Sequence, residues 1–75
     1  MKLTKWEEQI KNKIDSYTLN EFDYEKDQLL KIRELLSDLV REETDKHKYF
    51  TFRRLNYLMY IYAINLRIEQ EENKE

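Results

Sequence analysis

The chain has 75 residues, which fits one domain that can bury only about 60% of the surface of its unfolded chain. It contains no cysteine and one histidine, which excludes disulfides, thiolate metal sites and multi-histidine sites. Glycine and proline are absent, and charged residues form 40% of the chain at a net charge of −2, which excludes turn-rich sheets and favours a salt-bridged helical protein. We therefore expect one all-α domain over residues 1–75, stabilised by helix packing and by oligomerisation.

The first predicted helix covers residues 4–17. Thr4 and Glu7 have the spacing of a capping box, in which each side chain accepts a hydrogen bond from the backbone amide of the other residue. The apolar residues of this segment recur at helical spacing on one face, which we expect to enter the core: Leu3, Trp6, Ile10, Ile14 and Tyr17.

The second predicted helix covers residues 24–45 and follows a short connection. Its apolar series resembles the seam of a helical bundle, although it is too short for a true coiled coil: Phe22, Leu29, Ile32, Leu36 and Leu39. Residues 44–51 offer three capping side chains, Thr44, Asp45 and Thr51, so we expect the chain to break there. An unbroken helix from residue 24 to residue 70 is the alternative, because no glycine or proline interrupts it.

The third predicted helix covers residues 50–70, is rich in aromatic residues and is expected to lie at the centre of a three-helix bundle, with an acidic polar tail over 69–75 that frays. Its apolar residues form two stripes when they are placed at 100° per residue. The wider stripe contains Phe52, Leu55, Leu58, Met59, Tyr62, Ala63 and Leu66. The narrower stripe contains Phe50, Tyr57, Ile61, Ile64 and Ile68. We expect the wider stripe to pack on the first two helices and the narrower stripe to remain as an exposed ridge.

An exposed apolar ridge of this kind usually marks an interface. The sequence therefore predicts a protein that forms a homodimer or docks a target protein through Phe50, Tyr57, Ile61, Ile64 and Ile68. No catalytic motif is present, so we expect a non-enzymatic module with no catalytic residue, cofactor or metal. Small regulators and inhibitors, including those of phages and mobile elements, offer only an analogy of fold.

Nucleic-acid binding is the alternative function. Lys46, Lys48, Arg53 and Arg54 alternate with aromatic residues, and such a segment can neutralise phosphates while its rings stack on bases. The acidic character of the chain opposes this hypothesis, because residues 18–45 carry nine acidic and four basic side chains. No known nucleic-acid-binding motif is present.

The predicted location is the cytoplasm. The first residues lead into charged sequence and not into the apolar segment of a secretory signal. No run of about 20 apolar residues is present, so we expect no membrane partner.

Overall fold

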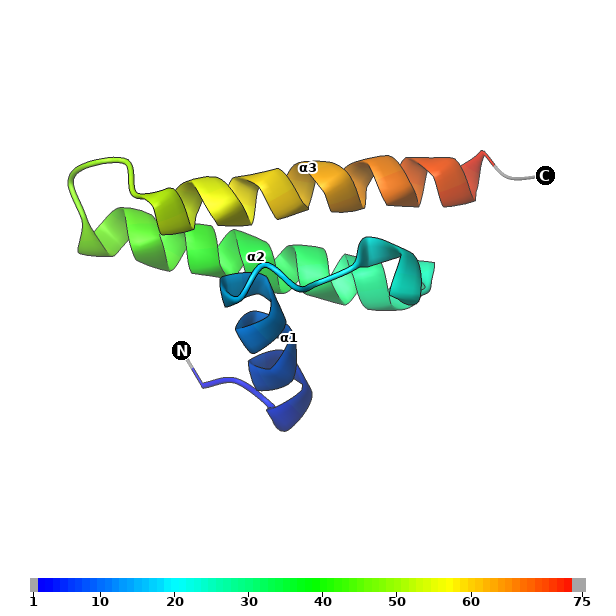
Figure 1. Cartoon of the computed structure of the whole chain (residues 1–75), viewed down its shortest axis with the longest axis horizontal. Helices are drawn as coiled ribbons and strands as arrows, with labels where there is room; N and C mark the ends of the chain where they lie inside the picture. The colour runs from blue at the N-terminus through cyan, green and yellow to red at the C-terminus, as the bar shows by residue number, and fades with distance from the viewer. Residues whose placement is uncertain (1, 74–75) are drawn as a thin grey trace.

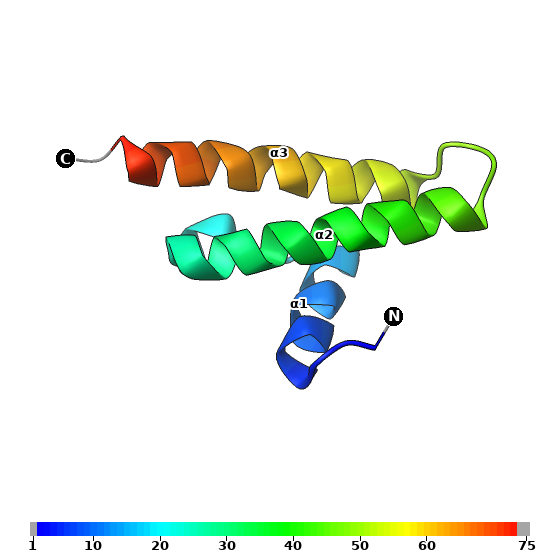
Figure 2. The same cartoon turned by 180° about the vertical axis from the view of Figure 1, so that it is seen from behind.

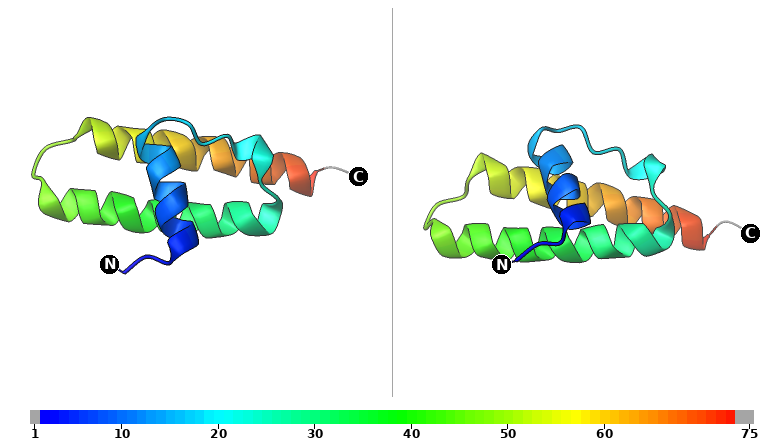
Figure 3. Two further views of the ribbon diagram at one scale, coloured as in Figure 1. Left: turned by 60° about the horizontal axis from the view of Figure 1, so that its bottom comes forward. Right: turned by 90° about the horizontal axis from the view of Figure 1, so that it is seen from below.

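The computed structural model describes residues 2–73, and in that range the chain forms three α-helices, one short 3₁₀ helix and no strand. In chain order these are α1 (Lys5–Asp15), η1 (Glu21–Asp23), α2 (Lys26–Lys46) and α3 (Phe52–Glu72). Helices α2 and α3 run antiparallel side by side, and α1 crosses this pair steeply (Figure 1, Figure 2). The segment between α1 and α2 passes along α3, which contacts α1, α2 and η1 (Figure 3). The prediction of an all-α domain with three helices is confirmed.

Helix α1 begins with the predicted capping box. Thr4 Oγ1 accepts a hydrogen bond from the Glu7 amide at 3.2 Å, and Glu7 Oε1 accepts one from the Thr4 amide at 2.9 Å. The two hydrogen bonds pair amides that the first turn of a helix leaves without backbone partners.

The end of α1 is a left-handed turn at Tyr17, whose φ is 61°. The Tyr17 amide donates to the Ile14 carbonyl at 3.1 Å, and the Thr18 amide donates to the Lys13 carbonyl at 2.8 Å. This pair of hydrogen bonds is a Schellman motif, which usually has glycine at the left-handed position. Because Tyr17 lies beyond the helix, it leaves the apolar face of α1 and is 68% exposed, so the prediction that it enters the core is wrong.

The predicted break between the second and third helices is confirmed, with residues 47–51 forming the loop. Thr51 caps α3 by accepting a hydrogen bond from the Arg54 amide at 3.1 Å. The Thr51 hydroxyl also donates to Glu43 Oε1 at 3.1 Å, and His47 Nε2 lies 3.6 Å from the same oxygen. The loop is thereby fastened to a buried carboxylate at the end of α2.

The core lies between α2 and α3 and beneath α1. Helix α2 contributes the predicted seam except for Phe22, which belongs to η1 and is 63% exposed. Trp6 is half-buried and packs at the edge of the core. The buried apolar residues contributed by α1, the connection and α2 are Ile10, Ile14, Leu19, Leu29, Ile32, Leu35, Leu36 and Leu39.

Helix α3 turns the opposite stripe inward from the one predicted. Tyr57, Ile64 and Ile68 are buried, with exposures of 2%, 0% and 4%, and Ile61 packs partly against the same core. Phe50 is the only residue of the predicted ridge that is exposed, at 54%. The expectation that the narrower stripe forms a surface for a partner is therefore wrong, and the wider stripe faces outward.

Polar contacts with the end of α1 help to fix this orientation of α3. Asn56 Nδ2 donates to the Ile14 carbonyl at 2.9 Å, and this buried hydrogen bond pairs a carbonyl near the end of α1. The Tyr57 hydroxyl donates to Asp15 Oδ1 at 3.0 Å. Tyr57 belongs to the narrower stripe, and Asn56 is its neighbour in the sequence. The narrower stripe must therefore face α1 for the two hydrogen bonds to form.

The C-terminal part of α3 is longer than the predicted helix and continues to Glu72. An ion pair between Arg67 and Glu71 supports its last turns. Of the predicted acidic tail, residues 74 and 75 lie outside the described residues.

Candidate protein-interaction surface

Five apolar side chains of α3 point away from the core, and we call them the outer stripe. Their exposed fractions run from 41% to 86%. Their positions are separated by three, four, three and four residues, which is the spacing of a coiled-coil seam. The outer stripe consists of Phe52, Leu55, Met59, Tyr62 and Leu66.

The surroundings of the outer stripe are uncharged along its central part. No charged residue occurs between Leu55 and Leu66, and the exposed Leu58 widens the apolar face. One long side of α3 carries no other element in Figure 1 or Figure 2. Within residues 2–73, this helix face is apolar over most of its length and has no intramolecular cover, which is the usual mark of an interaction site.

Two aromatic side chains from the segment between α1 and α2 flank the outer stripe. Tyr17 is 68% exposed, and Phe22 is 63% exposed beneath the Arg67 guanidinium, which lies 5.0 Å from the centre of the Phe22 ring. Both rings lie outside the core faces that the sequence predicts for them. For Tyr17, the only available signal is weak: many helices end in a left-handed residue, and in a chain without glycine another residue type has to take that position where such an end occurs.

Two tyrosine hydroxyl groups of α3 have structural roles: that of Tyr57 joins α3 to α1, and that of Tyr60 joins α3 to the connection after α1. Burial raises the pKa of Tyr57 well above its ordinary value of 10.0, and the hydrogen bond to the Asp15 carboxylate raises it further. Burial also raises the pKa of Tyr60, whose hydroxyl donates to the Leu19 carbonyl at 3.3 Å. Both hydroxyls therefore stay protonated near neutral pH and serve as hydrogen-bond donors.

The four basic residues of the nucleic-acid alternative gather where α2, the loop and α3 meet. Lys46, Lys48 and Arg53 are exposed. Arg54 is half-buried, with its guanidinium 4.7 Å from the centre of the Phe50 ring. Acidic side chains adjoin this cluster, because Lys46 Nζ lies 3.8 Å from Glu42 Oε1.

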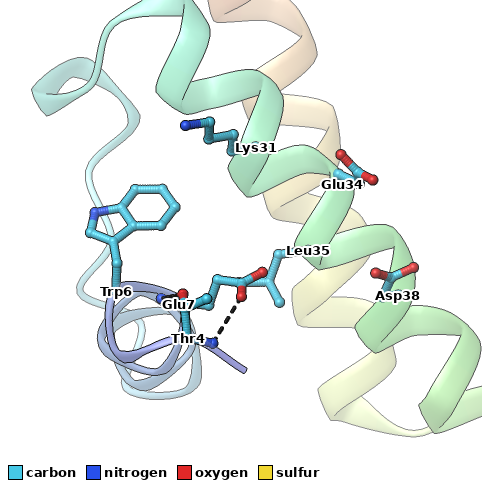
Figure 4. A pocket seen from close by; sticks show the side chains of 7 residues that line it. All are labelled: Thr4, Trp6, Glu7, Lys31, Glu34, Leu35 and Asp38. Carbon is cyan, nitrogen blue, oxygen red and sulfur yellow. Dashed lines mark hydrogen bonds between the residues drawn. The ribbon is translucent and has the colours of Figure 1, made fainter. Parts of the chain in front are cut away.

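A separate groove of about 460 Å³ lies between the start of α1 and α2 (Figure 4). Its polar lining includes Glu7, Lys31, Glu34 and Asp38. The Glu7 carboxylate is engaged by the α1 capping box, as the hydrogen bond drawn in Figure 4 shows. The side chains of residues 2–73 include no group of three or more metal-ligating residues.

No helix in the described part of the chain is long and apolar enough to cross a membrane. No family model, curated protein or solved structure matches the chain. Most of the exposed large apolar residues in the described range belong to the outer stripe or to the two rings beside it.

Proposed function

We propose that the protein is a non-enzymatic interaction module of a regulatory or inhibitory kind that binds another protein surface through the outer stripe of α3. The observation that carries this proposal is the exposure of five large apolar side chains at seam spacing on one helix face. A cytoplasmic location remains a prediction from the sequence.

The physical support for this proposal is the composition of the stripe. Aromatic residues and methionine are enriched at protein interfaces, and charged residues are depleted from the centre of such patches. The outer stripe combines two aromatic residues with Met59, and its charged neighbours lie towards the ends of the helix. A partner would remove from water an apolar surface that the fold leaves unprotected.

A pair of matched variants tests the proposal. Tyr62 in the outer stripe and Tyr49 in the loop have almost equal exposures, at 68% and 67%. We expect partners captured from the native lysate by the wild-type protein to be retained by Tyr49→Glu and lost by Tyr62→Glu. The proposal fails if no interaction, with itself or with another protein, depends on the outer stripe.

Nucleic-acid binding remains the second candidate because the loop exposes the rings of Tyr49 and Phe50 beside Lys48 and Arg53. Binding of this kind weakens steeply as salt is added, since each phosphate contact releases counterions. A salt titration with generic DNA and RNA is the test. We expect Arg53→Glu to remove binding if this candidate is right, and micromolar protein to show no salt-sensitive binding if the first proposal is right.

A further inference from the structure

Two hollows lie along the side of α3 that faces the connection between α1 and α2. The first has a volume of about 320 Å³, and its α3 lining is Asn56, Met59, Tyr60 and Ala63. The second has a volume of about 230 Å³, and its α3 lining includes Ala63, Leu66, Arg67 and Gln70. In each set the residues are separated by three, one and three positions, which is the arrangement of four residues that receives one side chain of a neighbouring helix in a coiled coil.

The two hollows form one groove with a heptad repeat. They share Ala63 and are displaced by seven residues, or about 10 Å along the helix. Tyr17 forms a wall of the first hollow, and Phe22 forms a wall of the second. The groove therefore fits a helix that presents two apolar side chains seven residues apart.

The outer stripe itself supplies such a pair. Leu55 and Tyr62 are seven residues apart, and both are exposed. In an antiparallel pair that sets Met59 opposite Tyr62 of a second copy, Leu66 falls opposite Leu55 of that copy, because the two chains run in opposite directions. Tyr62 of the second copy then lies at the first hollow and its Leu55 lies at the second, and a twofold axis repeats both contacts.

The charges at the two ends of α3 support the antiparallel direction. The first turn carries Arg53 and Arg54 with no acidic residue, and the last turn carries acidic residues with no basic one. The basic residues of the first turn and the acidic residues of the last turn both oppose the dipole of their own helix. In an antiparallel neighbour, the basic first turn of one α3 lies beside the acidic last turn of the other, so the opposite charges attract. Helix α2 is antiparallel to α3, but its first turn carries Lys26 together with Asp27 and so has no net positive charge to compensate the acidic end of α3.

We propose that the occupant of this groove is a second copy of the same chain, packed antiparallel along α3, with Tyr62 and Leu55 of each copy seated in the two hollows of the other. This inference rests on the proposed function and names the partner. It identifies Ala63 as the shared floor of the groove and Tyr17 and Phe22 as its walls.

Sedimentation equilibrium at tens of micromolar tests the assembly. We expect the wild type at twice the chain mass of 9.5 kDa, or 19 kDa. Tyr62→Glu should raise the dissociation constant by at least about 100-fold, as expected for an aromatic residue at an interface centre. Tyr49→Glu should leave the dimer intact, and circular dichroism should show that both variants keep the wild-type helix content.

A second variant separates a fitted groove from general stickiness. Ala63→Leu adds apolar surface but fills the floor of both hollows. A fitted groove predicts weaker self-association, by about 10-fold or more for an overpacked contact. Unchanged or stronger self-association would overturn the assignment of the hollows.

Cross-linking tests the direction of packing, because the chain has no cysteine of its own. We expect a short bis-maleimide to join Arg53→Cys to Glu69→Cys when the two variants are mixed, and to join little of either variant alone. A cross-link formed by Arg53→Cys with itself would show parallel packing and overturn the proposal. A monomeric wild type would also overturn it, while the proposed function would still stand or fall by its own test with Tyr62→Glu.

Discussion

Truncation of one side chain from each face of α3 gives the sharpest test of its orientation. Ile64 is 0% exposed and lies in the core, whereas Leu66, two positions later, is 43% exposed. Ile64→Ala removes buried methyl groups and leaves a cavity, for which about 2 to 5 kcal/mol of unfolding free energy is usual. Leu66→Ala leaves no cavity in the monomer, so its cost there is below about 1 kcal/mol.

The size of the chain makes this contrast easy to measure. A domain of 75 residues has a total stability of roughly 4 to 11 kcal/mol, so Ile64→Ala removes a large part of it. Urea unfolding followed by far-UV circular dichroism at about 1 μM measures both variants as monomers if the dimer dissociates at that dilution. At tens of micromolar, where a second copy covers Leu66, we expect the cost of Leu66→Ala to rise.

The result that would refute the orientation of α3 is equally clear. If Leu66→Ala destabilises the dilute protein more than Ile64→Ala, the outer stripe is the one that faces the core. The narrower stripe would then be the exposed ridge, and α3 would not present the two hollows to a second copy.

Three further predictions concern the joint between α1 and α3. Asn56→Ala should lower the unfolding free energy by about 1 kcal/mol, because it removes the buried hydrogen bond to the Ile14 carbonyl and leaves that carbonyl only its bond from the Tyr17 amide, whereas Asn12→Ala on an exposed position should have little effect in the same urea titration. Tyr17→Gly should raise the melting temperature, because about 1 to 2 kcal/mol of left-handed strain is relieved; an unchanged or lower value in a thermal melt at low concentration would contradict this. Since the folded pKa of Tyr57 is raised, its contribution to stability is complete below pH 10.0 and is lost as pH rises above that value; Tyr57→Phe should flatten this alkaline loss in unfolding measured from pH 9 to pH 11, while a slope identical to the wild type would refute the assignment.

Local signals were sufficient to predict the number of helices, the capping of α1 and the buried seam of α2. The capping box at Thr4, the cap at Thr51 and the seam from Leu29 to Leu39 all depend on residues close together in the sequence. Each of these features is fixed by interactions within one element or between neighbours in the chain; the structure confirms the capping box and the seam, and it selects Thr51 from the three predicted capping candidates.

The stripe of α3 that faces the core could not be predicted in the same way. Both of its stripes have helical spacing, and the wider one is no better suited to the core than the narrower one. The choice depends on hydrogen bonds from Asn56 and Tyr57 to the end of α1, 42 residues away in the sequence. One signal was available: isoleucine is among the most frequently buried residue types, and Ile61, Ile64 and Ile68 belong to the narrower stripe.

The packing of α1 on the rest of the domain determines the fraction of molecules in which the groove is complete. A helix of 11 residues is marginal in water on its own, so α1 is the element that we expect to open first. In molecules where α1 has opened, the left-handed turn at Tyr17 is released and the first hollow loses its wall. A helix that fills the groove must then shift the population towards closed molecules. Binding of such a helix would therefore slow hydrogen exchange at the amides of α1, although none of these amides lies on the bound surface.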